Sequence, residues 1–163
     1  KKINKNQHLK LKLFNPKIKV ALLKAFPNFS SDLLKNFSNY DGLVIEGFGL
    51  GHFPINKTDK LTSENAKIFL ELKKLAEKMP VVMTSQCIFG RVNMNVYDTG
   101  RKLQSAGILG NLADMTPEIA YIKLAWLLSN YKKSDVKSLI SENLRGEISD
   151  RTTVEFLGDD FNP

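Results

Sequence analysis

The chain has 163 residues, of which 42% are hydrophobic and 25% are charged. This length corresponds to one ordinary domain, and the composition argues against a disordered chain. The formal net charge of +7 favours a solubilising surface, with a polyanionic partner such as RNA as the alternative, and the scattered basic residues do not decide between them.

Cysteine content and hydropathy exclude several classes of protein. Cys87 is the sole cysteine, which excludes an internal disulfide and a multi-cysteine zinc site and favours a reducing, cytoplasmic compartment. No stretch approaches ~18 consecutive apolar residues, so we expect no membrane span. We predict no metal site in this chain.

Three short apolar runs predict the strands. They cover residues 20–23, 42–47 and 81–84, and runs of this length suit strands that are buried on both faces of a parallel sheet. Residues 108–109 are a candidate for a short fourth strand. Residues 1–17 precede these runs as a polar lead-in that ends near the turn signal Asn15-Pro16.

Helices are predicted between and after the runs. Their expected positions are a short helix capped by Ser30 or Ser31, a helix over about 63–78, a helix over about 96–106, a helix from Thr116-Pro117 to Ser129, and a last helix from Ser134 to a stop at Gly146. The alternation of strands and helices predicts βαβ units. We therefore expect a three-layer, Rossmann-like (flavodoxin-like) α/β domain with a small parallel sheet.

The first group of candidate site residues follows the second run, because ligands bind beyond the carboxyl ends of the strands in open parallel sheets. Gly47, Gly49 and Gly51 are followed by His52 and then by Pro54. The spacing differs from the dinucleotide fingerprint, which needs a helix to open at the last glycine. Two interpretations stay open: a tight strand-exit turn with a packing histidine, and a loop whose histidine contacts a ligand.

The second group ends the third run. Thr84 and Ser85 suit hydrogen bonds to a polar ligand or to a helix start, and Gln86 and Cys87 follow them. A buried small side chain is the favoured interpretation of Cys87, since the sequence shows no histidine or asparagine arranged to activate it as a nucleophile. No carboxylate pair has the spacing of an acid/base couple. These residues alone predict no self-sufficient active site.

The segment Met83–Tyr97 resembles the C-terminal domain of the asparaginase/glutaminase family. The resemblance continues through residues 99–103, 106–108, 114–118 and 143–147 and covers about residues 18 to 152. It implies the fold of the C-terminal domain of L-asparaginases for residues 18–148. Residues 1–17 would then be a linker from an N-terminal catalytic domain, and residues 149–163 a polar C-terminal tail.

Several segments favour one branch of this family, the D subunits of archaeal glutamyl-tRNA(Gln) amidotransferases. These segments are 49–52, 84–87, 90–97 and 146–151. The resemblance implies a protein that releases ammonia from glutamine, or asparagine, through a threonine nucleophile. It further implies a partner, the E subunit, that uses ATP and Mg to convert Glu-tRNA(Gln) to Gln-tRNA(Gln). It also implies a homodimer in which the smaller domain contributes residues to a neighbouring subunit's active site.

The threonine motifs that carry catalysis in this family do not occur in the chain, and the start at Lys1 fits a piece of a longer protein. The resemblance therefore assigns no catalytic residue and no bound cofactor here, and the chain alone is expected to be inactive. It makes five residues candidates for substrate or intersubunit contacts: Gly49, Gly51, His52, Asn93 and Tyr97. His52 stands where asparaginases carry a polar side chain that reaches the neighbouring subunit.

Two alternatives stay open. A type I L-asparaginase would normally have a Tyr-Gly-Val-Gly-Asn type of loop where this chain has Phe48–His52. A non-catalytic α/β ligand-binding module is the other alternative. Thr-Gly-Gly motifs upstream in the gene would argue against the module, and a copurifying partner would separate the amidotransferase from the asparaginase.

Overall fold

The structure, a computed structural model, describes residues 11–152. At its centre is a sheet of parallel strands in the order β1-β2-β3. The strands are β1 (Val20–Lys24), β2 (Gly42–Gly47) and β3 (Val81–Ser85). The parallel pairing of β1 with β2 and of β2 with β3 agrees with the pattern of apolar runs.

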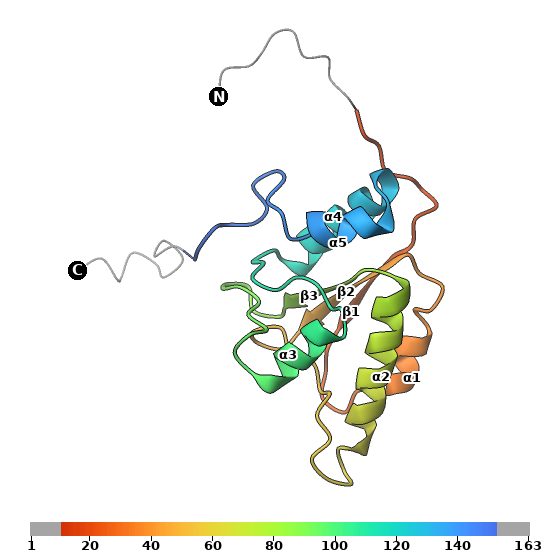
Figure 1. Cartoon of the computed structure of the whole chain (residues 1–163), viewed down its shortest axis with the longest axis vertical. Helices are drawn as coiled ribbons and strands as arrows, with labels where there is room; N and C mark the ends of the chain where they lie inside the picture. Colours follow the sequence, from red (N-terminus) through yellow and green to blue (C-terminus); the bar gives the residue numbers. More distant parts are fainter. Residues whose placement is uncertain (1–10, 153–163) are drawn as a thin grey trace, which may run out of the picture.

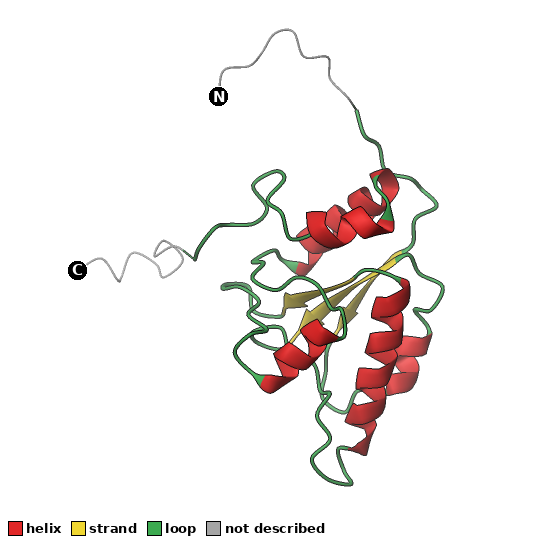
Figure 2. Ribbon diagram, in the orientation of Figure 1, coloured by secondary structure: helices red, strands yellow, loops and turns green. Residues whose placement is uncertain are grey.

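Helices cover both faces of this sheet (Figures 1 and 2). One side holds α1 (Ser31–Lys35), α2 (Ser63–Lys78) and α3 (Asp98–Ser105), and the other side holds α4 (Pro117–Asn130) and α5 (Lys133–Leu139). The molecule is therefore the expected three-layer α/β domain. Within residues 11–152, no helix has the length and apolar character needed to cross a bilayer.

Two hydrophobic cores lie on opposite faces of the sheet, because successive side chains of a strand point to opposite sides. Leu43 and Ile45 of β2 pack with α1, α2 and α3 in one core. Val44, between them, packs with α4 and α5 in the other core. The sheet is thus buried on both faces, which explains why its strands are continuous apolar runs instead of alternating ones.

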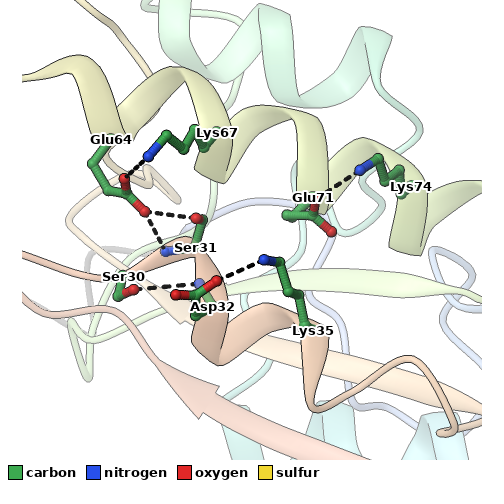
Figure 3. A network of polar contacts seen from close by, with 8 residues as sticks. All are labelled: Ser30, Ser31, Asp32, Lys35, Glu64, Lys67, Glu71 and Lys74. Atoms are coloured by element: carbon green, nitrogen blue, oxygen red, sulfur yellow. Dashed lines mark hydrogen bonds and ion pairs between the residues drawn. The ribbon is translucent and has the colours of Figure 1, made fainter.

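A hydrogen-bond network joins α1 to α2 (Figure 3). Ser30 caps α1 by accepting from the backbone N–H of Asp32. The backbone N–H and hydroxyl of Ser31 donate to Glu64 Oε1 at 3.0 and 2.6 Å, and Lys67 Nζ lies 2.9 Å from Glu64 Oε2. The hydrogen bond from the Ser31 hydroxyl, followed by the one from Lys67, lowers the pKa of Glu64 to about 2. The first helix, only five residues long, is thereby tied to a longer neighbour.

The prediction of a fourth strand at residues 108–109 is wrong. Leu109 makes one isolated parallel bridge, to Val82, with backbone hydrogen bonds from Leu109 N to Val81 O and from Met83 N to Leu109 O, each 2.8 Å. The next residue, Gly110, has a φ of +96°, so the chain turns away from the sheet at this point. A single bridge forms where a strand was predicted.

Substituting Gly110 tests this close approach. A Cβ on Gly110 would lie 2.3 Å from the backbone oxygen of Met83, whereas a Cβ on Gly90 would meet nothing within 4 Å although its φ of +97° is nearly the same. Gly90→Ala therefore isolates the strain of the positive φ. We expect Gly110→Ala to lower the free energy of unfolding by about 1–3 kcal/mol more than Gly90→Ala does, because it also overpacks the site. Urea unfolding of both variants measures the difference, and equal losses would contradict the prediction.

The last helix is shorter than expected, since α5 ends at Leu139 and not near Gly146. Side-chain oxygens accept hydrogen bonds from the backbone N–H groups that would bond within a longer helix. Gly146 N donates to Asn143 Oδ1 at 2.7 Å, and Leu144 N donates to Glu147 Oε1 at 3.0 Å. The segment after α5 therefore folds into a turn.

A buried ion pair fastens this turn to α4. Lys123 Nζ lies 2.7 Å from Glu147 Oε1, with side chains that are 5% and 13% exposed, and it also donates to the backbone oxygen of Glu142. Burial alone would raise the pKa of Glu147, but the hydrogen bonds from Lys123 and from the backbone of Leu144 and Arg145 outweigh it and lower the pKa to about 2. Glu147 is therefore ionised at neutral pH.

Candidate functional site

The loop after β2 folds back on itself at the carboxyl edge of the sheet. Gly51 N and His52 N both donate to Phe48 O at 2.9 Å, and Phe48 and His52 form an antiparallel bridge. Gly49 and Gly51 have φ values of +46° and +93°, which L side chains adopt only with strain. The glycines therefore build a tight turn, and that turn presents His52 beside the strand ends.

Gly51 has a second role, in packing. A Cβ at this position would lie 2.7 Å from Val92 Cγ1 and 3.0 Å from Met83 Cγ, whereas a Cβ on Gly49 would meet nothing within 4 Å. The turn is thus seated on β3 and on the segment around Val92. Of the two candidate glycines, only Gly51 is required by close contact as well as by backbone conformation.

His52 lies in a small cluster with Tyr97 and Thr99, which we call the His52 cluster. Its Nδ1 is 3.0 Å from Thr99 Oγ1, and its ring meets the ring of Tyr97 edge-on, with the centroids 5.3 Å apart. Its Nε2 is buried and has no hydrogen-bond partner among residues 11–152. Burial lowers the pKa of His52 below its ordinary value of 6.5, so the ring is neutral at pH 7.

Two members of the polar group at the end of β3 are structural. Thr84 is 1% exposed and its hydroxyl donates to Ile45 O at 2.9 Å. Gln86 Nε2 donates to Ala25 O at 2.7 Å and to Glu46 O at 3.1 Å. These side chains join the ends of the three strands, so their hydrogen-bonding groups are used inside the sheet.

Ser85 and Cys87 lie next to the glycine turn. The Ser85 hydroxyl donates to Gly49 O and accepts from Cys87 N at 3.0 Å. The expected burial of Cys87 is wrong, because its side chain is exposed. The reason is that β3 ends at Ser85, so Cys87 already belongs to a loop outside the sheet.

The segment around Asn93 connects the glycine turn to the rest of the edge. Asn93 N donates to Leu50 O at 2.9 Å, and its side-chain oxygen accepts from Asn95 N at 3.3 Å. Tyr97, four residues further along the chain, is 58% exposed, and its ring packs edge-on against the ring of His52. The five candidates for substrate or intersubunit contacts therefore come together at one edge of the sheet, and their role in binding stays a prediction.

Thr99 is the residue of the cluster that sequence reasoning missed. The pattern Asp98-Thr99-Gly100 resembles a catalytic acid and hydroxyl pair, but its favoured interpretation is a helix start, and Asp98 is indeed the first residue of α3. Thr99 and His52 are 47 positions apart in the chain, and no spacing rule predicts such a contact. Within the described part of the chain, no group of three or more His, Cys, Asp or Glu side chains is arranged to hold a metal ion.

Comparison with known proteins assigns the family. Residues 19–139 match the glutaminase/asparaginase C-terminal domain. The chain belongs to this family. Among solved structures, the domain is similar to the thermostable L-asparaginase from Thermococcus kodakarensis, with a TM-score of 0.72 and 28% identity over 85% of this chain and 39% of that one. It is also similar to L-asparaginase I from Vibrio cholerae, with a TM-score of 0.72 and 29% identity over 88% of this chain and 41% of that one.

Curated relatives of this asparaginase-type domain are named as the D subunit of glutamyl-tRNA(Gln) amidotransferase. The protein from Methanobrevibacter smithii is 43% identical over 142 residues, which are 85% of this chain and 30% of that protein. The protein from Pyrococcus abyssi is 43% identical over 140 residues, or 84% and 30%. The chain thus spans about a third of the length of these relatives, and it corresponds to their asparaginase C-terminal domain.

Residues 11–17 of the expected linker lie against α4 of the asparaginase-type domain. Trp126 Nε1 donates to Lys12 O at 3.0 Å, and Asn130 Nδ2 donates to Leu13 O at 3.1 Å. Together with residues 144–147, the two segments line a groove of about 820 Å³, whose apolar side chains include Leu11, Phe14, Ile119, Ile122 and Trp126. None of the candidate site residues lines this groove.

The two expected ends of the chain are described only in part. Ser149 N donates to Asp114 Oδ1 at 3.0 Å, and Arg91 Nη2 donates to Ser149 O at 3.1 Å, so the first residues of the expected polar tail are held against the domain. Residues 1–10 of the linker and 153–163 of the tail lie outside the described residues.

Proposed function

We propose that the chain is the smaller domain of the glutaminase subunit of a tRNA-dependent amidotransferase, which converts Glu-tRNA(Gln) to Gln-tRNA(Gln) in the cytoplasm. The observation that carries the proposal is the 43% identity, over 85% of this chain, to a protein named as the D subunit of glutamyl-tRNA(Gln) amidotransferase. In the full-length protein, a threonine nucleophile outside this chain releases ammonia from glutamine. A partner, the E subunit, activates the tRNA-bound glutamate with ATP and Mg.

The His52 cluster is the part that this domain contributes to the reaction. In a homodimer, it faces the active site of the neighbouring subunit and holds the charged head group of the amino acid. The buried, unpartnered Nε2 of His52 supports this role, because buried polar atoms without a partner are rare and call for an explanation. A hydrogen bond to a substrate carboxylate would provide that partner.

The test is reconstitution of the complete enzyme. The full-length protein that contains this chain is coexpressed with an E subunit from the same genome and given glutamine, ATP, Mg and Glu-tRNA(Gln). We expect Gln-tRNA(Gln) to form only when both subunits and glutamine are present. Failure of amidation with an active, copurifying pair would contradict the proposal.

A second candidate function, a type I L-asparaginase, is favoured by the likeness to solved L-asparaginases. It predicts rapid asparagine hydrolysis by the full-length protein alone and no need for a partner. Steady-state ammonia release from asparagine and from glutamine, each with and without the E subunit, separates the two functions.

The chain by itself is expected to release no ammonia from glutamine or asparagine. Covalent catalysis needs a nucleophile in contact with its activating base, and the family's threonine motifs are absent from this sequence. A coupled ammonia assay of the purified 163-residue chain checks this, and release above the buffer blank would contradict it.

A further inference from the structure

Thr99 lies in the first turn of α3 with its hydroxyl directed at His52. The distance from Thr99 Oγ1 to His52 Nδ1 is 3.0 Å. Across residues 11–152, the structure gives the Thr99 hydroxyl no other hydrogen bond, and it gives His52 Nε2 none at all. The His52 ring is therefore hydrogen-bonded at Nδ1, while Nε2 has no hydrogen-bond partner among the described residues.

The chemistry of imidazole makes the two nitrogens depend on each other. A neutral ring has one N–H donor and one acceptor, and a threonine hydroxyl can serve either as donor or as acceptor. When the hydroxyl donates to Nδ1, the ring proton sits on Nε2 and that atom becomes a donor. When Nδ1 carries the proton and donates to the hydroxyl, Nε2 becomes an acceptor.

The nature of the incoming group decides which arrangement is useful. An ionised carboxylate only accepts hydrogen bonds, so it pairs with a neutral ring only through Nε2–H. The lowered pKa of His52 favours the neutral ring at pH 7, and a doubly protonated ring is then not the donor. A hydroxyl that donates to Nδ1 therefore prepares the ring for an acceptor-only ligand.

We infer that Thr99 is a positioning residue that holds His52 in its Nε2–H tautomer and so turns the ring into a hydrogen-bond donor for the carboxylate of the amino-acid substrate. The contact between Thr99 and His52 stands on the structure alone, whereas the choice of this tautomer and of the substrate rests on the proposed function. Tyr97 lies edge-on against the same ring and is 58% exposed. Tyr97 belongs to neither hydrophobic core, so a movement of its side chain would disturb neither of them.

Two substitutions in the full-length protein, assembled with its partner, test the inference. Thr99→Val keeps the shape of the side chain and removes the hydroxyl, whereas Thr99→Ser keeps the hydroxyl. Ser105→Ala is the matched control, because it removes an exposed hydroxyl from the same helix, where Ser105 Oγ bonds only its own turn through Lys102 O. Thermal unfolding of each variant verifies that it is folded.

We expect Thr99→Val to lower kcat/KM for glutamine hydrolysis about 3- to 10-fold, the range that corresponds to one net hydrogen bond. The loss should appear mainly in KM, because binding of the head group is affected equally in the ground state and the transition state. Thr99→Ser and Ser105→Ala should stay within about twofold of the unchanged enzyme. A serine variant as impaired as the valine variant, or a valine variant without effect, would overturn the inference.

A spectroscopic measurement tests the tautomer without relying on activity. In full-length protein labelled with ¹⁵N-histidine, the ring shifts of His52 are assigned by their disappearance in His52→Gln. We expect the pattern of a proton on Nε2 and an unprotonated Nδ1, and a more even mixture of tautomers in Thr99→Val. A proton on Nδ1 in the unchanged protein would overturn the inference. Absence of glutaminase activity together with the expected tautomer would count against the proposed function and not against the role of Thr99.

Discussion

The Lys123→Met variant is expected to lose about 3–5 kcal/mol of unfolding free energy, as proteins do when one partner of a buried ion pair is removed. Lys123 is the partner that compensates Glu147, with 2.7 Å between Nζ and Oε1 and side chains only 5% and 13% exposed. Methionine fills a similar volume but leaves the carboxylate without its cation. Urea unfolding at pH 7 measures the loss.

A double substitution separates the ion pair from simple packing. In Lys123→Met with Glu147→Gln, no uncompensated charge stays buried, so the double variant should recover a large part of the loss. The carboxylate accepts from Leu144 N and Arg145 N on separate oxygens, so the single glutamine oxygen can replace one of these two acceptors and the recovery stays incomplete. A double variant as unstable as Lys123→Met would mean that the lysine stem, and not its charge, stabilises the turn after α5.

The loss of unfolding free energy in Lys123→Met should become smaller as the pH falls. The pKa of Glu147 is lowered from 4.5 to about 2 in the folded chain, so its ionised form contributes stability above about pH 4.5. That contribution is lost as the pH falls toward 2, because the folded carboxylate then becomes protonated. The difference between the unchanged chain and Lys123→Met should therefore shrink between pH 5 and pH 2 instead of growing.

Elements with strong local signals were predictable from the sequence. The expected bounds 63–78 agree with those of α2, and Thr116 caps α4 by accepting from Ile119 N, with Pro117 as the first helical residue. These signals act within one or two turns of chain. The parallel pairing of the three strands followed from the apolar runs and from their alternation with helices.

Features that depend on contacts between distant segments were not predictable in this way. The apolar pair at 108–109 gives one bridge because the chain turns away from the sheet at Gly110, which packs against the backbone of Met83. The last helix ends early because Glu147 captures backbone N–H groups near it while pairing with Lys123. Neither contact follows from periodicity, since each depends on where another element lies.

The candidate site shows the same division. The glycine turn and the position of His52 at the strand edge followed from the sequence, because parallel strands end at one edge. The different roles of the polar residues at the end of β3 did not follow from the sequence. Thr84 and Gln86 donate hydrogen bonds into the sheet, while Cys87 is exposed. The role of each side chain is set by its neighbours in space, which the order of residues does not give.

On the proposed function, the His52→Ala variant of the full-length protein is expected to lose about 10- to 150-fold in kcat/KM for glutamine hydrolysis. A hydrogen bond to a charged group contributes about 1.5–3 kcal/mol, and each 1.36 kcal/mol corresponds to about a factor of ten in rate. His52 offers its Nε2 for such a bond because Thr99 already occupies Nδ1 and no other group among the described residues pairs with Nε2.

Steady-state kinetics of His52→Ala, with light scattering to verify the dimer, decide between two roles of this histidine. If the ring binds the substrate carboxylate, the dimer stays intact while kcat/KM falls, and combining Thr99→Val with His52→Ala adds no further loss, because Thr99 acts only through the ring. If the ring only packs at the interface between subunits, the variant weakens association while the remaining dimer hydrolyses glutamine at the unchanged rate. An intact dimer with unchanged kcat/KM would remove His52 from the site, and Thr99 with it.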